Sequence, residues 1–435
     1  MKQTLTTMIL TKNRLCKSLS FLLYITLTSH AYSAAEYKKY TVIFYVAADN
    51  NLYRYAEQKV QSLAALGSNQ AVNFVMHLDL HIENNKRQTF RYYFDTNQQV
   101  RHINQFDKST QAMDSGAPET LISCCQWAVE SYPAENYILI IWNHGSGPVD
   151  PIIGRITTTT PKPKTKKPHT RGICWSDSTK NYLNNQKLEF ALSEIKDKIL
   201  YGEKFKLIGF DACLMGALEI ANITKEYADV MVASQEVEWV PGWHWTLSFQ
   251  PLHNQNMNGE DLAKHIVSVY EKLNNYARRR YTLSALNLNT IEAIENNLHE
   301  AAGLLIIALA YQKNNSVNSA ITTSRHKKNC TYFDEPAYLD LHHLYQNLLQ
   351  RIEQFSLATP DEAAIKEELK NVLQSGCQLI EDSVIANATG TMFEKAKGIS
   401  IYFPESGMHP SYPKTKFGNS NSWLKFLKIY DIMDH

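Results

Sequence analysis

The sequence has few cysteines, no excess of either charge and no long apolar run. Seven cysteines in 435 residues are too few for a fold held together by disulfides. Lys and Arg number 44 and Asp and Glu number 43, so the net charge of +1 argues against a large nucleic-acid-binding face. The apolar runs at residues 19–27 and 304–310 fall well short of the ~20 residues that a membrane-spanning helix needs. With 44% hydrophobic and 20% charged residues, the composition is that of an ordinary globular protein.

The first 35 residues have the features of a secretory signal peptide. Basic residues precede the short apolar run, and small residues follow it up to Ala35. Cleavage after Ala31 or after Ala35 fits this pattern, and an uncleaved anchor is the alternative. We therefore expect an exported protein, secreted or periplasmic, with no membrane span after cleavage. Cleavage removes Cys16 and leaves six cysteines.

After the signal peptide, strand-like apolar runs alternate with amphipathic helical patterns. The continuous apolar runs at residues 40–48 and 136–142 are typical of strands buried on both faces of a sheet. Helical patterns follow at residues 55–66, 118–131 and 187–200. This alternation predicts an α/β fold, in which a mostly parallel sheet is flanked by helices.

The C-terminal part of the chain adds further helices. Their patterns lie near residues 290–312, 338–357 and 360–381. Thr359, followed by Pro360, marks the start of the last one. The apolar run at residues 397–404 predicts a late strand. We expect three parts: a signal peptide at 1–35, an α/β domain at 36–290 and a helical region at 291–435 that returns this strand to the fold.

Two residues with catalytic potential lie just beyond strand candidates, where open α/β sheets place their active sites. His144 follows the strand in LIIWNHGSG, and Cys213 follows another strand in GFDACLMG. A cysteine nucleophile is usually activated by histidine, and a helix starting near Leu214 would favour the thiolate. The N–H groups of Gly145 and Cys213 would stabilise a developing oxyanion. The alternatives are a core cysteine and a histidine in an ordinary turn.

The motifs WNHGSG, GFDACLMG, ASQE and PGW together resemble the clostripain family of cysteine peptidases, which has a caspase-like fold. The resemblance extends from about residue 40 to the end of the chain. It implies that His144 is the catalytic base and Cys213 the nucleophile. It also implies that Asp211 holds a basic P1 side chain through charge-assisted hydrogen bonds. A helix N-cap is the alternative role for Asp211.

The implied function is a secreted cysteine endopeptidase that cleaves protein or peptide substrates after Arg or Lys. A catalytically silent secreted binding protein on the same fold is one alternative, and a cysteine transpeptidase or amidase is another. The chemistry of a Cys–His dyad requires no cofactor. Enzymes of this family can depend on calcium, but no stretch resembles an EF-hand loop, so calcium remains possible without an assigned site.

A basic loop at residues 155–171 separates the two catalytic motifs and is rich in Thr and Pro. By the resemblance, the protein is a zymogen that cleaves itself in this loop. Lys162 and Lys167 precede proline, which usually blocks hydrolysis. The candidate self-cleavage sites are therefore Arg155, Lys164, Lys166 and Arg171. Cleavage by another protease, or a role as a linker, is the alternative.

Two further clusters have both a functional and a structural interpretation. His77, Asp79 and His81 alternate along a strand and would share one face, as metal ligands or, more commonly, as a solvated strand end. The sequence EWVPGWHW contains Trp239 and His244. This stretch forms either a wall of the substrate groove or a packed loop, and His244 would compete with His144 as the base.

Overall fold

Strand β1 (Lys38–Ala48) shows why the fold is built around a sheet covered on both faces. In the computed structural model, Ile43 and Tyr45 pack into one hydrophobic cluster, whereas Val42 and Phe44 pack into another on the opposite face. Alternate residues of a strand point to opposite faces, so an uninterrupted apolar run requires cover on both. The structure describes residues 37–82, 86–95, 100–102, 112–151, 172–254, 257–275, 278–313, 315–357 and 359–434.

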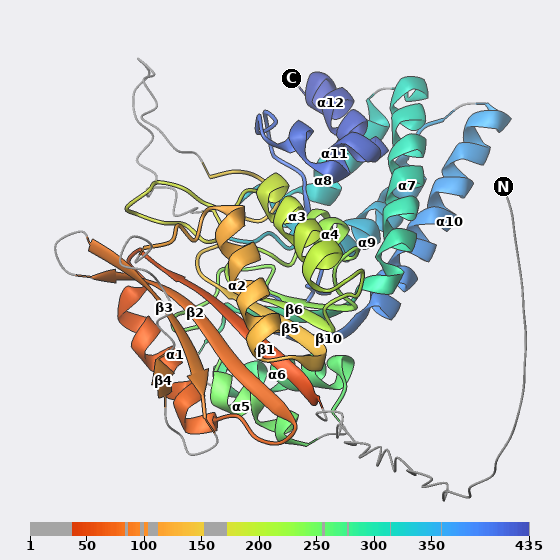
Figure 1. The fold of residues 1–435 in the computed structure, drawn as a ribbon. Helices are drawn as coiled ribbons and strands as arrows, with labels where there is room; N and C mark the ends of the chain where they lie inside the picture. The colour runs from red at the N-terminus through yellow and green to blue at the C-terminus, as the bar shows by residue number, and fades with distance from the viewer. Residues whose placement is uncertain are drawn as a thin grey trace, which may run out of the picture. The chain divides into compact units, whose positions relative to one another are not determined.

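The main sheet has the strand order β10-β8-β7-β6-β5-β1-β2-β3-β4 (Figure 1). Neighbours from β7 to β2 pair in parallel, and the pairs at both edges are antiparallel. The predicted α/β fold with a mostly parallel sheet is therefore confirmed. The other strands are β2 (Val72–Ile82), β3 (Lys86–Phe94), β4 (Val100–His102), β5 (Ala134–Trp142), β6 (Leu207–Asp211), β7 (Val230–Ala233), β8 (Thr282–Asn287) and β10 (Val384–Thr389).

Helices cover the two faces of this sheet separately (Figure 1). One face carries α1 (Tyr53–Leu66), α5 (Trp245–Phe249) and α6 (Gly259–Asn274). The other carries α2 (Pro118–Ser131), α3 (Asn185–Glu194) and α4 (Leu218–Thr224). A π-helical turn, Ile195–Ile199, extends α3. The predicted helices at 55–66 and 118–131 match α1 and α2 closely, because each has a clear apolar stripe and a clear end.

The C-terminal helices pack beside α4 on the second face. They are α7 (Ile291–Tyr311), α8 (Ser316–Arg325), α9 (Leu341–Arg351), α10 (Pro360–Ser383), α11 (Lys416–Ser420) and α12 (Ser422–Asp434). Thr359 and Glu362 form the capping box that starts α10. Among the residues described, no helix is both long enough and apolar enough to span a membrane.

The predicted strand at 397–404 contains β11 (Ser400–Tyr402), which pairs with β9 (Tyr338–Asp340) in a separate small sheet. The C-terminal strand that joins the main sheet is β10, which follows directly after α10. β11 nevertheless lies close to the turn that contains Cys213. The Ser400 N–H donates to the carbonyl oxygen of Gly216, three residues after Cys213, over 2.9 Å. Residues 37–435 form one compact unit, and the predicted signal peptide lies outside the described residues.

One local prediction is wrong. The helix expected to start near Leu214 begins at Leu218, so Cys213 lies in a turn and not at a helix N-terminus. Leu214 has a positive φ of 64°, and its N–H donates to the carbonyl oxygen of Glu236 over 3.2 Å. The backbone after Cys213 is therefore held by the segment after β7, which prevents the helix from starting there.

Candidate active site

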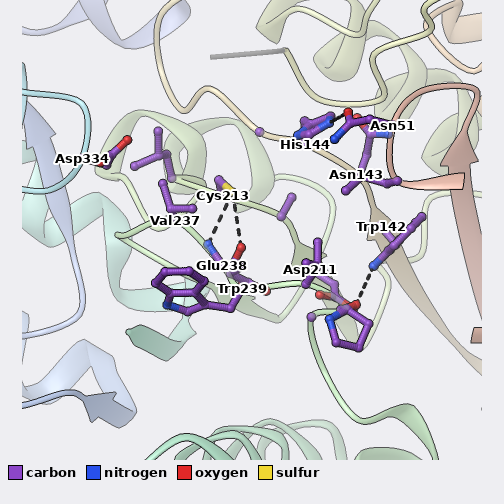
Figure 2. Close-up of a pocket in the computed structure, with 17 residues that line it drawn as sticks. Asn51, Trp142, Asn143, His144, Asp211, Cys213, Val237, Glu238, Trp239 and Asp334 are labelled. Carbon is purple, nitrogen blue, oxygen red and sulfur yellow. Dashed lines mark hydrogen bonds between the residues drawn. The ribbon is translucent and has the colours of Figure 1, made fainter. Parts of the chain in front are cut away.

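The ends of β5 and β6 bring the two predicted catalytic residues together. These strands pair in parallel with Trp142 opposite Asp211, so His144 and Cys213 each lie two residues beyond the same register position. Both residues line one cavity of about 470 Å³. Figure 2 shows Cys213 in the middle of this cavity with His144 to one side. A thiol and an imidazole placed in this way at the carboxyl edge of a parallel sheet can act as a nucleophile and a base.

Gly145 allows the two strand ends to approach closely. A Cβ atom on residue 145 would lie 2.1 Å from the carbonyl oxygen of Cys213, far inside van der Waals contact. The glycine after the histidine is therefore required by the packing of one backbone against the other. This contact also brings together the two residues whose N–H groups the sequence suggests as an oxyanion hole.

His144 has a hydrogen-bond partner that the sequence analysis did not identify. The Nε2 atom of His144 lies 2.9 Å from Oδ1 of Asn51, and both side chains line the cavity (Figure 2). An amide oxygen accepts, so this bond places the proton on Nε2 and leaves Nδ1 as the basic nitrogen. Asn51 follows β1, the strand next to β5. The only signal in the sequence is that polar residues end β1 at this edge of the sheet.

The segment 173–178, which follows the basic loop, packs against residues next to the dyad. The Trp175 N–H donates to Oδ1 of Asn143 over 2.9 Å, and Asn143 directly precedes His144. The side-chain amide of Asn50 donates to the Trp175 carbonyl oxygen over 2.7 Å, and Asn50 directly precedes Asn51. Segment 173–178 therefore supports both members of the His144–Asn51 pair.

A buried carboxylate anchors the same segment. Asp49 accepts from the Ser176 hydroxyl at 2.5 Å and from the Ser178 hydroxyl at 2.9 Å. The Ser178 N–H donates to Asp49 as well, and His81 lies 3.1 Å from the other carboxylate oxygen. Asp49 is 1% exposed, so these bonds satisfy a charge that would otherwise be costly to bury.

Cys213 has an unusually basic thiol. Burial is the main cause, and the carboxylates of Glu238, Glu236 and Asp334 add to it, so the pKa of Cys213 rises to about 12. The N–H of Glu238, 3.3 Å from Sγ, acts in the opposite direction (Figure 2). The expected help from a helix N-terminus is absent because α4 starts too late. The thiol is therefore neutral at neutral pH, and a base has to take its proton during attack.

Comparison with known proteins identifies the family of this chain. The profile of the clostripain family matches residues 44–434. The chain belongs to the clostripain family. The resemblance inferred from the motifs is thereby confirmed.

Clostripain of Hathewaya histolytica is 24% identical over 352 residues, which cover 72% of this chain and 62% of clostripain. The chain thus matches less than two thirds of the length of that relative. A secreted C11 cysteine protease from Bacteroides thetaiotaomicron, solved with an irreversible peptide inhibitor, is similar in fold. Its TM-score is 0.59 at 17% identity, over 91% of this chain and all of that one. An inactive zymogen C11 protease from Parabacteroides distasonis has a TM-score of 0.59 at 19% identity, over 90% and 98% of the two chains.

In this member of the clostripain family, Asp211 lines the cavity. Its side chain is 1% exposed and forms an ion pair with Lys59 of α1, with 2.9 Å between Nζ and Oδ2. No sequence pattern points to Lys59, because an isolated lysine in an amphipathic helix normally faces solvent. Asp211 does not cap a helix, since α4 starts seven residues later.

The tryptophans of the stretch 239–245 lie in two different environments, the wall of the cavity and the hydrophobic core. Trp239 is 46% exposed and lines the cavity, whereas Trp243 and Trp245 are buried in the core. The interpretation as a packed loop therefore holds for Trp243 and Trp245, and a substrate-groove wall at Trp239 stays a prediction. His244 lines a neighbouring cavity and caps α5 by accepting from the Leu247 N–H over 3.4 Å. His144, and not His244, shares the cavity with Cys213.

The alternating His77, Asp79 and His81 have separate partners. His77 is buried and its ring stacks on Tyr45, Asp79 accepts from the Ser115 hydroxyl at 2.9 Å, and His81 pairs with Asp49. Within the described ranges, no group of three or more His, Cys, Asp or Glu side chains is arranged to hold a metal ion.

The six cysteines of the described residues are free. Five of them do not line the cavity: four are buried in the hydrophobic interior, and Cys377 packs partly buried against it. Cys213 is the cysteine beside His144. The candidate self-cleavage sites Arg155, Lys164, Lys166 and Arg171 lie outside the described residues.

Proposed function

We propose that this protein is an exported cysteine endopeptidase that cleaves peptide bonds after Arg or Lys. The observation that carries the proposal is the pair of His144 and Cys213 beyond adjacent parallel strands, in one cavity. Membership of the clostripain family supports the same reaction. Export to the periplasm or the outside rests on the signal-peptide features of residues 1–35.

In the proposed reaction, Sγ of Cys213 attacks the carbonyl carbon of the scissile bond while His144 accepts the thiol proton. The basic thiol favours this concerted transfer over a preformed thiolate. The N–H groups of Gly145 and Cys213 stabilise the oxyanion. The C–N bond then breaks, His144 returns the proton to the leaving amine, and water hydrolyses the thioester.

The acidic residues that line the cavity support the proposal that the substrate has a basic P1 side chain. Asp211 and Glu238 both border the cavity, and carboxylates bind guanidinium and ammonium groups through charge-assisted hydrogen bonds. Trp239 supplies an apolar wall against which the methylene groups of Arg or Lys can pack. The substrates are therefore proteins or peptides with a basic P1 side chain.

We also propose self-processing in the 155–171 loop, at one of the four candidate bonds. Incubation of the wild type and of Cys213→Ala, followed by intact-mass measurement, tests this. The expected result is cleavage of the wild type only. A Cys213→Ala protein cut at the same bonds shows that another protease is responsible.

Fluorogenic peptides with Arg, Lys, Asp or Leu at P1 test the proposed function. The expected result is cleavage of the Arg and Lys peptides by the mature protein and none by Cys213→Ala. If no peptide is cleaved even after the loop has been nicked, with and without calcium, the silent binding protein becomes the better description. An added amine acceptor separates hydrolysis from transpeptidation.

A further inference from the structure

The small sheet of β9 and β11, from the C-terminal part of the chain, contacts the segments of both proposed catalytic residues. The two strands pair in antiparallel. Tyr338 of β9 forms hydrogen bonds with the loop after His144. Ser400 of β11 forms hydrogen bonds with the turn that contains Cys213. The sheet therefore connects the segment that carries the nucleophile with the segment that carries the base.

The hydroxyl group of Tyr338 holds the loop after His144 at two points. It donates to the carbonyl oxygen of Ser146 over 2.6 Å and accepts from the Val149 N–H over 3.2 Å. Tyr338 is 0% exposed, so bulk water does not compete for these bonds. Ser146 directly follows Gly145, whose N–H is the proposed oxyanion donor. The hydroxyl thus fixes the backbone next to two groups of the proposed reaction.

Gly147 brings the same loop into close contact with its neighbours on two sides. A Cβ atom on residue 147 would lie 2.9 Å from Cε2 of Tyr338 and 2.7 Å from the carbonyl oxygen of Leu214. The φ of Gly147 is 66°, in the left-handed region that glycine adopts without strain. The loop is therefore packed between the tyrosine ring and the backbone of the residue after Cys213. A shift of the ring would move the loop, because close-packed groups transmit displacement.

Ser400 fixes the turn on the other side. Its N–H and its hydroxyl both donate to the carbonyl oxygen of Gly216, over 2.9 Å and 3.0 Å. The Gly216 N–H in turn donates to the carbonyl oxygen of Ser234 over 2.7 Å. Gly216 lies three residues after Cys213, and Ser400 is buried. Hydrogen bonds therefore hold both backbone groups of Gly216 in the turn of the nucleophile.

The small sheet is itself fixed to the segment after β7. The Asp340 carboxyl group, opposite Ser400 in the register, accepts from the side-chain amide of Gln235 over 3.0 Å and from the Lys397 N–H over 2.7 Å. The side-chain oxygen of Gln235 accepts from the Gly398 N–H over 3.1 Å. A buried network of this kind makes its members rigid. Residues on a rigid support can hold a reacting group to within about 0.5 Å.

We propose that Tyr338 is a positioning residue that sets the distance between the imidazole of His144 and Sγ of Cys213, and that Ser400 sets this distance from the other side. This inference rests on the proposed function and deepens it. Transfer of the thiol proton requires hydrogen-bond reach between the two groups. A misplacement of about 1 Å lowers the rate by about a hundredfold. Neither Tyr338 nor Ser400 lines the cavity, so substrate binding does not depend on them directly.

Tyr338→Phe tests the proposal, because it keeps the ring and removes only the hydroxyl group. We expect kcat for a basic peptide to fall about ten- to a hundredfold with KM nearly unchanged. Alkylation of Cys213 by iodoacetamide, measured at pH 9 without substrate, should stay within about twofold of the wild-type rate. The thiol reacts normally because the groups that shift its pKa stay in place.

Tyr402→Phe is the matched control. The hydroxyl of Tyr402 accepts from the His409 N–H over 2.7 Å, and its ring centre lies 6.2 Å from that of Tyr338. This variant loses a buried hydrogen bond in the same cluster, and it should lower the melting temperature while kcat stays near the wild-type value.

Ser400→Ala is a second test, which also applies where Tyr338→Phe does not fold. The variant keeps the backbone hydrogen bond to Gly216 and removes the one from the hydroxyl. We expect kcat to fall about three- to tenfold with KM nearly unchanged.

The proposal is overturned if Tyr338→Phe keeps the wild-type kcat and only loses stability, as Tyr402→Phe does. It is also overturned if kcat, KM and the alkylation rate of Tyr338→Phe all change together, since that pattern indicates a general loss of active-site structure. Where Tyr338→Phe does not fold, a normal kcat in Ser400→Ala overturns it. Failure of the proposed function looks different, because the wild type itself then cleaves no peptide and the inference fails with it.

Discussion

At the scale of single residues, the contact between His144 and Asn51 distinguishes this site from a bare dyad. Asn51 lies 93 positions before His144 in the chain and holds the imidazole of His144 through a hydrogen bond at Nε2. A base that is oriented by a third group loses less entropy when it reaches the thiol. We propose Asn51 as a positioning residue for His144.

For Asn51→Ala we expect kcat to fall by about ten- to a hundredfold with KM nearly unchanged, since an interaction that orients the base is removed while substrate binding is not. Asn51→Asp keeps an acceptor oxygen and should retain more activity than Asn51→Ala. Steady-state kinetics with one basic peptide measure both. An unchanged kcat in Asn51→Ala would show that the hydrogen bond has no catalytic role.

The high pKa of Cys213 leads to a second prediction, on how fast the thiol is alkylated at different pH values. Without substrate, alkylation by iodoacetamide should accelerate about tenfold per pH unit from pH 7 to pH 10, because the thiolate fraction rises steadily below a pKa of about 12. Asp334→Asn removes a carboxylate that raises this pKa and should increase the rate about two- to fivefold at any fixed pH. Labelling of Cys213 followed by mass spectrometry gives the rates. A plateau near pH 8 would contradict this picture and indicate a preformed thiolate.

At the scale of elements, segment 173–178 connects the end of the basic stretch 155–171 to the residues next to His144 and Asn51. Its hydrogen bonds to Asp49, Asn50 and Asn143 fix the residues next to Asn51 and His144. The segment is thus a structural support of the active site.

Ser176→Ala/Ser178→Ala should therefore lower both kcat and the melting temperature. Each removed hydrogen bond to the buried Asp49 carboxylate contributes about 1.5–3 kcal/mol. Asp177→Asn is a matched control in the same segment. The Asp177 side chain accepts from Trp175 Nε1 at 2.8 Å and pairs with Lys180 at 3.9 Å, so the substitution keeps the bonds to Asp49, Asn50 and Asn143 and should change kcat little. Peptide kinetics and thermal melts measure the two effects. A double variant with normal kcat but a lower melting temperature would limit the segment to a stabilising role.

At the scale of the whole molecule, the basic loop lies between two strands of one sheet. β5 precedes the loop and β6 follows it, and the two pair in parallel. A cut within residues 155–171 leaves the shared sheet intact. We expect the two pieces to elute together in native size-exclusion chromatography and to separate in denaturant. Separation under native conditions would show that the continuous loop holds the sheet together.

Buried carboxyl groups should make the stability of the whole molecule depend on pH. Burial raises the pKa of Asp79 to about 7, against the opposing effects of Ser115 and Arg87, and Asp49 adds to the rise. Burial raises the pKa of Glu219 to about 7 as well. Between pH 4 and pH 7 these two groups bind protons in the folded state that they have released in the unfolded state. Their contribution to stability therefore falls with rising pH, by about 1.4 kcal/mol per unit for each group.

Asp79→Asn should remove about half of this slope and stabilise the protein at pH 8 relative to the wild type. Denaturant titrations at several pH values measure the free energy of unfolding directly. Glu219→Gln is the matched comparison at the second site, although it also alters hydrogen bonds to Tyr412 and Tyr402. A pH slope that is the same in Asp79→Asn and in the wild type would contradict the assignment. The wild-type profile alone does not test it, because burial lowers the pKa of His77 to about 3 and that of His343 to about 4, and these groups add stability as pH rises.

The sequence by itself determined the features that depend on neighbouring residues. The apolar run of β1, the ends of α1 and α2, and the helix start at Thr359 are local, and each was predicted with nearly the observed bounds. The histidine and cysteine motifs are also local patterns, and they were sufficient to identify the clostripain family.

Only the tertiary structure decided what surrounds those motifs. Asn51 reaches His144 across 93 positions, and Lys59 reaches Asp211 across 152. The turn after Cys213 forms because the segment after β7 holds its backbone, which overrides a local preference for helix. Contacts of this kind depend on strand order and on the packing of α1 under the sheet, and no pattern in a short stretch of sequence encodes them. Charge and basicity at the site follow from these long-range contacts.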